Sequence, residues 1–156
     1  MDMPVSKPGH AALRLGRTSL PGQVYHVTVT TRRQQRYFEP FAAACTASRA
    51  FTDGKSLGDA RLLAWVLMPD HAHWLLQLGD RDTLSVVVGR MKARSGRAVN
   101  RLRGEKRPVW ASAYQDHALR SDEDLAGVAR YIVANPLRAK LVRALADYAF
   151  WDAVWL

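Results

Sequence analysis

Two apolar runs separated by a proline constrain the fold more than any other part of the chain. Residues 61–68 read RLLAWVLM and residues 71–79 read HAHWLLQLG, and Pro69 and Asp70 lie between them. Both runs have the composition of strands, and a proline between them fits a turn better than a ladder position. The pattern therefore predicts an antiparallel hairpin.

The segments on either side of this hairpin predict the rest of a sheet. Residues 23–31 alternate β-branched and aromatic side chains as a strand does, and residues 40–56 have helical spacing of apolar residues. Residues 82–103 predict a basic amphipathic helix, and residues 109–120 a last strand. This order predicts an α+β fold: a ferredoxin-like split βαββαβ antiparallel sheet with helices on one face.

A further helix is expected after these elements. Ser121 can cap it by accepting a hydrogen bond from the amide of Asp124, and Asn135 followed by Pro136 should stop or bend it. Residues 137–156 form a basic closing segment.

Length and composition indicate one compact domain. The chain has 156 residues, of which 48% are hydrophobic, enough for a single core. Residues 1–20 have no sustained period and are expected to be a loose basic leader, with one domain over residues 21–156. The single cysteine, Cys45, excludes an internal disulfide. No apolar stretch is long enough to span a membrane, and we expect a cytoplasmic, nucleoid-associated protein.

The charge points to an acidic partner. Lys and Arg number 23 against 14 Asp and Glu, which gives a formal net charge of +9. Nucleic acid is the leading partner of such a chain, although ribosomal and membrane-surface proteins share this charge.

His71 and His73 lie two residues apart in the second strand of the hairpin. Side chains at that spacing point to the same face of a strand, so the two imidazoles could share a metal ion. Two hydrogen-bonded imidazoles without a metal are the plainer alternative. A structural zinc site is disfavoured, because no further cysteine or histidine stands at compatible spacing, whereas a catalytic divalent ion takes water and phosphate as its other ligands.

Tyr131 and Asn135 are one helical turn apart, and we expect both at the edge of the apolar stripe of the last helix. The phenol and the amide would then project to the same side of the helix. A boundary tyrosine and a helix-end asparagine are the alternatives from the residues alone.

Taken together, the segments PGQVYHVTVTTRRQQRYF, AWVLMPDHAHWLLQL and YQDHALRSDEDLAGVARYIVANPLRAKLV resemble the REP-associated tyrosine transposases, a bacterial branch of the single-strand HUH transposases. The resemblance covers roughly residues 21–153. It implies that a C-terminal helix carries a nucleophilic tyrosine, Tyr131, and that His71 and His73 hold Mg²⁺ or Mn²⁺. Asn135 matches the position of a third metal ligand, at which insertion-sequence relatives have Gln, and His117 matches a family motif with a possible supporting role.

The activity that the resemblance implies is DNA transposition by a single-strand endonuclease that forms a 5′-phosphotyrosine. The expected DNA is a REP-type hairpin with an unpaired flank, bound by a monomer or a homodimer. Trp110 or Tyr114 could stack unpaired bases. The basic residues expected to contact DNA are Arg32, Arg33, Arg36, Lys92, Arg94, Arg97, Arg101, Arg130 and Arg138.

Other functions remain open from the sequence. A non-catalytic ferredoxin-like nucleic-acid-binding protein would explain the charge and the strands, but it would leave the histidine pair and Tyr131 unconnected. A basic toxin or a ribosome-associated protein could share the fold. A metal-free phosphoesterase with two H-x-[ST] motifs is disfavoured, because the chain has one H-x-H.

Overall fold

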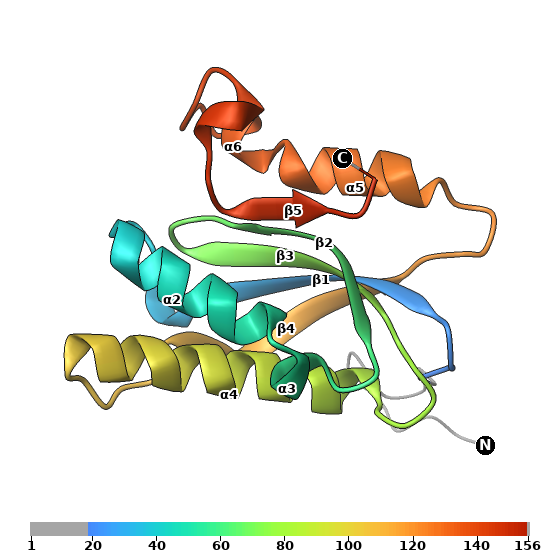
Figure 1. Ribbon diagram of the computed structural model, residues 1–156, viewed down its shortest axis with the longest axis horizontal. Coiled ribbons are helices and arrows are strands. Elements are labelled where there is room, and N and C mark those ends of the chain that lie inside the picture. The colour runs from blue at the N-terminus through green and yellow to red at the C-terminus, as the bar shows by residue number, and fades with distance from the viewer. Residues whose placement is uncertain (1–18, 156) are drawn as a thin grey trace, which may run out of the picture.

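The structure is a computed structural model that describes residues 19–155. A five-stranded antiparallel sheet forms its centre, in the spatial order β4-β1-β3-β2-β5. Helices cover both faces of the sheet (Figure 1). The expected leader, residues 1–20, lies almost wholly outside the described residues. The strands are β1 (Val24–Thr31), β2 (Arg61–Leu67), β3 (His71–Gln77), β4 (Trp110–Ala118) and β5 (Trp151–Ala153), and the helices are η1 (Arg32–Gln34), α2 (Phe41–Thr52), α3 (Gly54–Leu57), α4 (Leu84–Arg103), α5 (Leu125–Val133), α6 (Asn135–Arg138) and η2 (Leu145–Asp147).

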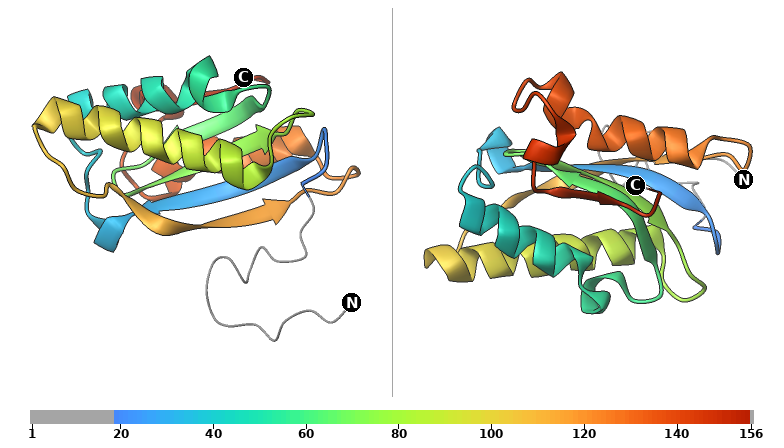
Figure 2. Two further views of the ribbon diagram at one scale, coloured as in Figure 1. Left: turned by 90° about the horizontal axis from the view of Figure 1, so that it is seen from below. Right: turned by 45° about the horizontal axis from the view of Figure 1, so that its top comes forward.

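The predicted βαββαβ order and the hairpin are confirmed. β2 and β3 pair antiparallel, and the chain turns between them at residues 68–70. α2 and α4 lie side by side on one face of the sheet (Figure 2). Their apolar stripes and the sheet bury a core that includes Phe51, Trp74 and Met91.

The structure adds two features to the expected architecture. α5 packs on the opposite face of the sheet from α2 and α4, where Ile132 and Val133 join Leu75 and Val66 in a second core. The helices are therefore not confined to one face. β5, within the segment expected only to close the chain, pairs with β2 at the edge of the sheet.

The last helix begins later than expected. The carboxylate of Asp124 caps α5 by accepting a hydrogen bond from the amide of Gly127, at 3.0 Å. Ser121 precedes the helix because residues 120–123 form their own turn, in which the amide of Arg120 donates to the carboxylate of Glu123. The expectation that Ser121 caps the helix is wrong, and the nearer carboxylate takes that role.

Within residues 19–155, no helix is both long and apolar enough to cross a lipid bilayer.

Candidate active site and nucleic-acid interface

His71 and His73 lie side by side on the face of the sheet that α5 covers. Both belong to β3, whose intervening residues Ala72 and Trp74 point into the core beneath α2 and α4. The two imidazole centroids are 5.2 Å apart, with the rings nearly perpendicular. The expected shared orientation of the pair is therefore present.

Neighbouring groups hold each imidazole through its Nδ1 atom. Nδ1 of His71 lies 2.7 Å from a carboxylate oxygen of Asp70. Nδ1 of His73 lies 3.1 Å from Oγ1 of Thr28 and 3.0 Å from Nε2 of His26. This arrangement is typical of metal-binding histidines, because a partner on one ring nitrogen fixes the orientation of the ring and leaves the other nitrogen for a ligand.

Four histidines form a row across three neighbouring strands, β4, β1 and β3. His26 of β1 lies opposite His117 of β4 in register, and Thr28 of β1 lies opposite His73 of β3. We call His117, His26, His73 and His71 the histidine row. His117 is exposed at its outer end, 3.9 Å from a carboxylate oxygen of Glu123. His117 is therefore the member of the row at the β4 edge, at the end opposite His71.

The electrostatics of the row favour neutral imidazoles. Burial lowers the pKa of His73 to about 3, with further contributions from His26, His71 and the guanidinium of Arg138. Burial also lowers the pKa of His26, and His117 adds to this shift. A neutral imidazole keeps a nitrogen lone pair, which metal coordination requires.

The donor set near the histidine pair is small. Among residues 19–155 there is no group of three or more His, Cys, Asp or Glu side chains that could hold a metal ion. The two Nε2 atoms of His71 and His73 fit a divalent ion that draws its remaining ligands from water and a phosphate oxygen. They do not fit a closed structural site of four protein ligands.

Tyr131 extends from α5 into solvent. Its side chain is on the outer side of the helix and the residue is 63% exposed. The guanidinium of Arg138 stacks over its ring, with Cζ 3.9 Å from the centroid. The charge of Arg138 also makes the smallest of the contributions that lower the pKa of His73. In the described residues the ring of Tyr131 contacts Arg138 and neither imidazole of the expected pair.

Asn135 lies just beyond the end of α5. α5 ends at Val133, and Ala134 leads into α6, in which Pro136 occupies the first turn. Nδ2 of Asn135 donates to the carbonyl of Ile132 at 2.7 Å, which leaves the amide oxygen without a part in this bond. The expected place of Asn135 beside Tyr131 and its metal role stay predictions.

Several of the expected DNA contacts line two adjoining hollows at the β4 edge of the sheet. Arg32 and Arg33 line a hollow of about 130 Å³ together with Arg107. Lys92 and Arg97 line a groove of about 380 Å³ between α4 and β4, which Arg107 also borders. Arg33 has a left-handed backbone with φ of 57°, uncommon for a residue with a side chain, as the chain turns out of β1.

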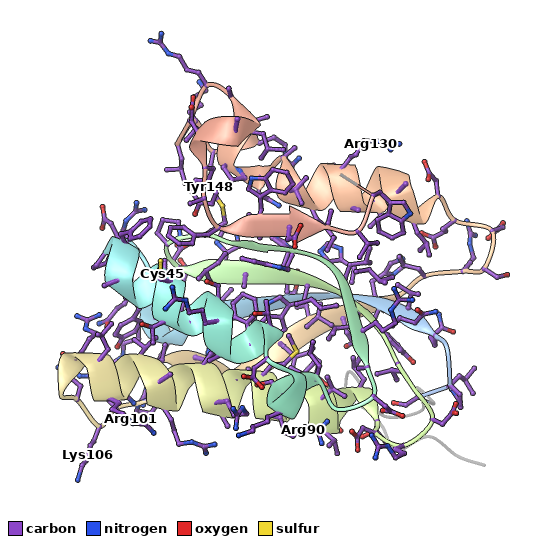
Figure 3. All side chains as sticks on the ribbon, viewed as in Figure 1. Cys45, Arg90, Arg101, Lys106, Arg130 and Tyr148 are labelled. Atoms are coloured by element: carbon purple, nitrogen blue, oxygen red, sulfur yellow. The ribbon has the colours of Figure 1, made fainter. Side chains whose placement is uncertain are left out.

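Other expected contacts lie elsewhere on the surface. Arg36 pairs with Glu39 at 3.2 Å, and Arg130 lies 3.6 Å from Asp124 on the outer side of α5 (Figure 3). Arg101 is exposed near the end of α4 and lines neither hollow (Figure 3). Exposed ion pairs of this kind are weak and can exchange for phosphate.

Three residues expected at the DNA surface form internal contacts instead. Nε of Arg94 donates to Oγ of the buried Ser56 at 2.9 Å, which ties α4 to α3. The indole of Trp110 donates to Oγ of Ser95 at 2.9 Å, and Trp110 and Tyr114 are both buried against α4. Since their ring faces are covered, the expectation that they stack bases is corrected.

Three residues that contact the histidine pair were not predicted from the sequence: His26, Thr28 and Asp70. His26 and Thr28 alternate with valines in the sequence, which marks them as the polar side of β1, but nothing in that pattern reveals that Thr28 lies opposite His73. Asp70 adjoins His71 in sequence and was interpreted only as a turn residue. Strand register is a property of the folded sheet.

Comparisons with known proteins identify relatives of this chain. The family model described as "Transposase IS200 like" matches residues 20–135. A REP-associated tyrosine transposase of Escherichia coli is 29% identical over 89 residues, which cover 56% of this chain and 50% of that protein. A Haemophilus influenzae protein named for the same class is 26% identical over 98 residues, 56% of each chain. This chain spans about half the length of the curated relatives it matches.

A solved structure has the same fold. It is described as a REP-associated tyrosine transposase bound to a REP hairpin, and its TM-score with this chain is 0.67 at 22% identity. The match covers 86% of this chain and 79% of that one.

Proposed function

The chain belongs to the IS200-like transposase family, whose model matches most of its length, and from this premise we propose that it cuts and rejoins single-stranded DNA with Tyr131 as the nucleophile. The observation that carries the proposal is the position of Arg138. Its guanidinium lies over the phenol ring, and α5 covers the face of the sheet that carries the imidazole pair. A phosphate bound by Arg138 would therefore lie beside the nucleophile, on the helix that packs over His71 and His73.

The cutting step is a direct displacement at phosphorus. The phenolic oxygen of Tyr131 forms a bond to the phosphorus of a phosphodiester, and the bond from phosphorus to the 3′ oxygen breaks. One O–H bond is lost at the phenol and one is formed at the released 3′-hydroxyl, so the step needs no other reactant. The product is a 5′-phosphotyrosine with a free 3′ end.

Arg138 and the histidine pair have separate roles in this step. Arg138 binds and orients the phosphate, and the imidazoles of His71 and His73, held by Asp70 and Thr28, offer Nε2 atoms for Mg²⁺ or Mn²⁺. When bound there, such an ion supplies Lewis-acid polarisation of a non-bridging phosphate oxygen. Asn135 donates through Nδ2 to a backbone carbonyl, so its amide oxygen is the atom that would bind such an ion.

Rejoining follows from the chemistry of the intermediate. The phosphotyrosine keeps an ester bond, so a 3′-hydroxyl of another strand end can attack the phosphorus and release the phenol. The reaction is close to isoenergetic and needs no nucleotide hydrolysis. The chain accordingly contains no G-x-x-x-x-G-K-[ST] motif.

We propose a DNA hairpin with an unpaired flank as the substrate. The support comes from the names of the curated relatives, which are REP-associated, and from the hairpin in the similar solved structure. The basic hollows at the β4 edge supply cations for the backbone of such a DNA.

Mass spectrometry of the protein after incubation with labelled oligonucleotides and Mn²⁺ tests the proposal. We expect a covalent adduct on a peptide that contains Tyr131, formed with single-stranded flanks and not with a blunt duplex. Chelation should abolish the adduct, and Tyr131→Phe should abolish it while DNA binding persists. Circular dichroism checks that Tyr131→Phe is folded as the wild type is. Equal cleavage by Tyr131→Phe would exclude the mechanism and favour a protein that only binds nucleic acid.

A further inference from the structure

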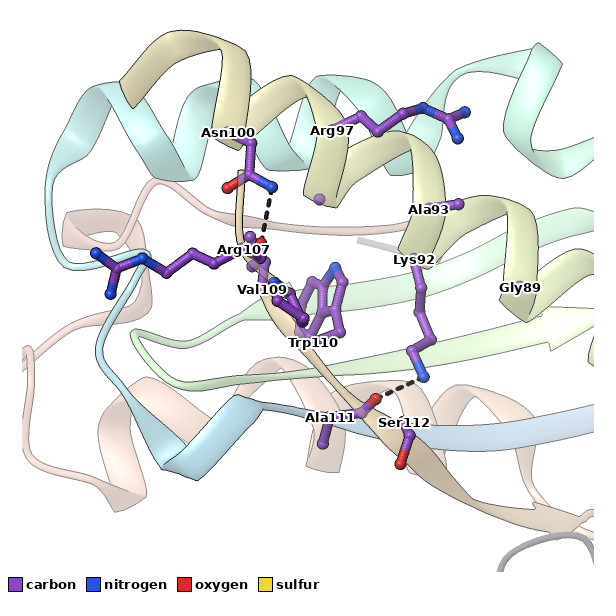
Figure 4. Close-up of a pocket in the computed structure, with 12 residues that line it drawn as sticks. Gly89, Lys92, Ala93, Arg97, Asn100, Arg107, Val109, Trp110, Ala111 and Ser112 are labelled. Atoms are coloured by element: carbon purple, nitrogen blue, oxygen red, sulfur yellow. Dashed lines mark hydrogen bonds between the residues drawn. The ribbon is translucent and has the colours of Figure 1, made fainter. Parts of the chain in front are cut away.

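The groove between α4 and β4 is a built feature of the fold rather than a gap in the surface (Figure 4). Two hydrogen bonds join its walls: Nζ of Lys92 donates to the carbonyl of Ala111 at 2.7 Å, and Nδ2 of Asn100 donates to the carbonyl of Arg107 at 2.8 Å. The two donors are eight residues apart on α4, and the two acceptors are Ala111 in β4 and Arg107 in the segment before it. These bonds set the width of the groove at both ends.

Two glycines of α4 keep the groove open. Gly89 and Gly96 lie along its floor on one side of the helix. Neither has a positive φ, a methyl group at position 89 would meet no neighbouring atom within 4 Å, and one at position 96 would make only ordinary contacts with Trp110 and Val109, at 3.7 and 3.8 Å. Since glycine weakens a helix and neither packing nor backbone conformation requires it here, the effect of both glycines is to leave space.

The lining of the groove is cationic. Lys92, Arg97 and Arg107 border it, and none of its lining residues is acidic. Among residues 19–155 Arg97 forms no ion pair, so its charge is available to a ligand. The volume of about 380 Å³ falls within the range of ligand pockets.

The groove adjoins the hollow at the end of β1. The hollow lined by Arg32 and Arg33 shares Arg107 and Pro108 with it. That hollow lies at the end of β1, where Thr30 is opposite His71 in register. Cationic side chains thus lead from the groove to the end of the sheet at which His71 lies.

We propose that this groove binds an unpaired DNA strand, with one nucleotide seated over Gly89 and Gly96 and its phosphates at Arg97 and Arg107. The identity of the ligand as DNA rests on the proposed function. An unpaired nucleotide can enter such a space, whereas paired bases stay within their stack and leave the space unfilled. The groove then holds the strand at a distance from the cut, and its residues act on binding rather than on the reaction.

Fluorescence anisotropy with labelled oligo(dT) in EDTA measures this binding without cleavage. Gly89→Leu fills the groove and should weaken oligo(dT) binding about tenfold, the effect of losing one seated base in complexes of this kind. Gly89→Ala leaves the groove open and should bind as the wild type does. A blunt duplex of the same length should bind equally to all three proteins, and circular dichroism checks that each is folded.

A second pair of variants tests the phosphate contact. Arg97→Gln should reduce the slope of log K against log salt for oligo(dT) by about 0.7, the value for one lost contact to a single strand. Arg49→Gln removes the same charge from an exposed position of the neighbouring helix α2, outside the groove and outside the expected DNA contacts, and should leave the slope unchanged.

Three results would overturn the groove assignment: no binding of oligo(dT), equal losses for oligo(dT) and duplex in Gly89→Leu, or equal slopes for the two arginine variants. The covalent adduct at Tyr131 is a separate measurement. Failure of the adduct with these binding differences intact would refute the proposed reaction and keep the groove, and the reverse pattern would keep the reaction.

Discussion

Replacing Gly89 by alanine should make the folded protein more stable. Position 89 is exposed within the 20-residue helix α4, its backbone is helical, and an added methyl group meets no atom within 4 Å. The substitution therefore changes neither packing nor strain, and what remains is the difference in helix propensity. That difference is about 0.8–1 kcal/mol in favour of alanine. For a chain of this size it corresponds to a rise in Tm of about 2–4 °C.

Urea and thermal unfolding, followed by circular dichroism and tryptophan fluorescence, measure the effect. Gly104→Ala is the matched control at the end of the same helix. Gly104 ends α4 with a φ of +65°, and a methyl group there also meets nothing within 4 Å, so only conformational strain changes. We expect a loss of about 1 kcal/mol. A destabilised Gly89→Ala, or two variants that shift in the same direction, would show that α4 does not have the geometry described.

Three further predictions concern single side chains. Burial raises the pKa of Tyr148 to about 12, so the folded state retains its proton as pH rises above 10 while the unfolded state loses it; stability present below pH 10 is lost between 10 and 12. The stability difference between wild type and Tyr148→Phe should therefore shrink across this window by about 1–2 kcal/mol, after allowance for the exposed part of the ring, and a constant difference in urea titrations would contradict the shift. Ser95→Ala leaves the buried indole N–H of Trp110 without its acceptor and should destabilise the chain by about 1–3 kcal/mol in the same titrations; an unchanged midpoint would mean that this bond contributes nothing. Asp70→Asn removes the carboxylate that holds His71 and should weaken Mn²⁺ binding about 10–100-fold in calorimetry, with equal affinities counting against the metal assignment.

The sequence predicted the elements of the fold better than their placement. The hairpin, the alternation of β1 and the amphipathic α4 follow from local periodicity, and all three are present. β5 was not expected, because a strand of three residues carries too little pattern to stand out, and it forms only by pairing with β2. The opposite placement of α5 also depends on tertiary packing, since an apolar stripe does not say which face it will cover.

The candidate site, like the fold, was predictable from the sequence only in part. Spacing alone predicts that His71 and His73 share a face, because side chains alternate along any strand. The partners of His73 come from β1 and depend on register, and the exposure of Tyr131 depends on how α5 sits on the sheet. Arg138 was expected to meet DNA, and the Asn135–Pro136 pattern predicts that the helix stops or bends before it, but that pattern does not reveal the contact of Arg138 with the ring of Tyr131.

β5 has a consequence for anyone who shortens this chain. It covers one side of β2, where Val154 and Phe150 also exchange backbone hydrogen bonds with Leu63 and Leu67. A version trimmed before residue 150 would present a bare row of amide and carbonyl groups along an apolar strand, and such a row recruits any other extended chain it meets. Cleavage of an affinity tag close to this end, or a fusion that displaces β5, should therefore cause aggregation. This aggregation should appear before any effect on chemistry at the histidines.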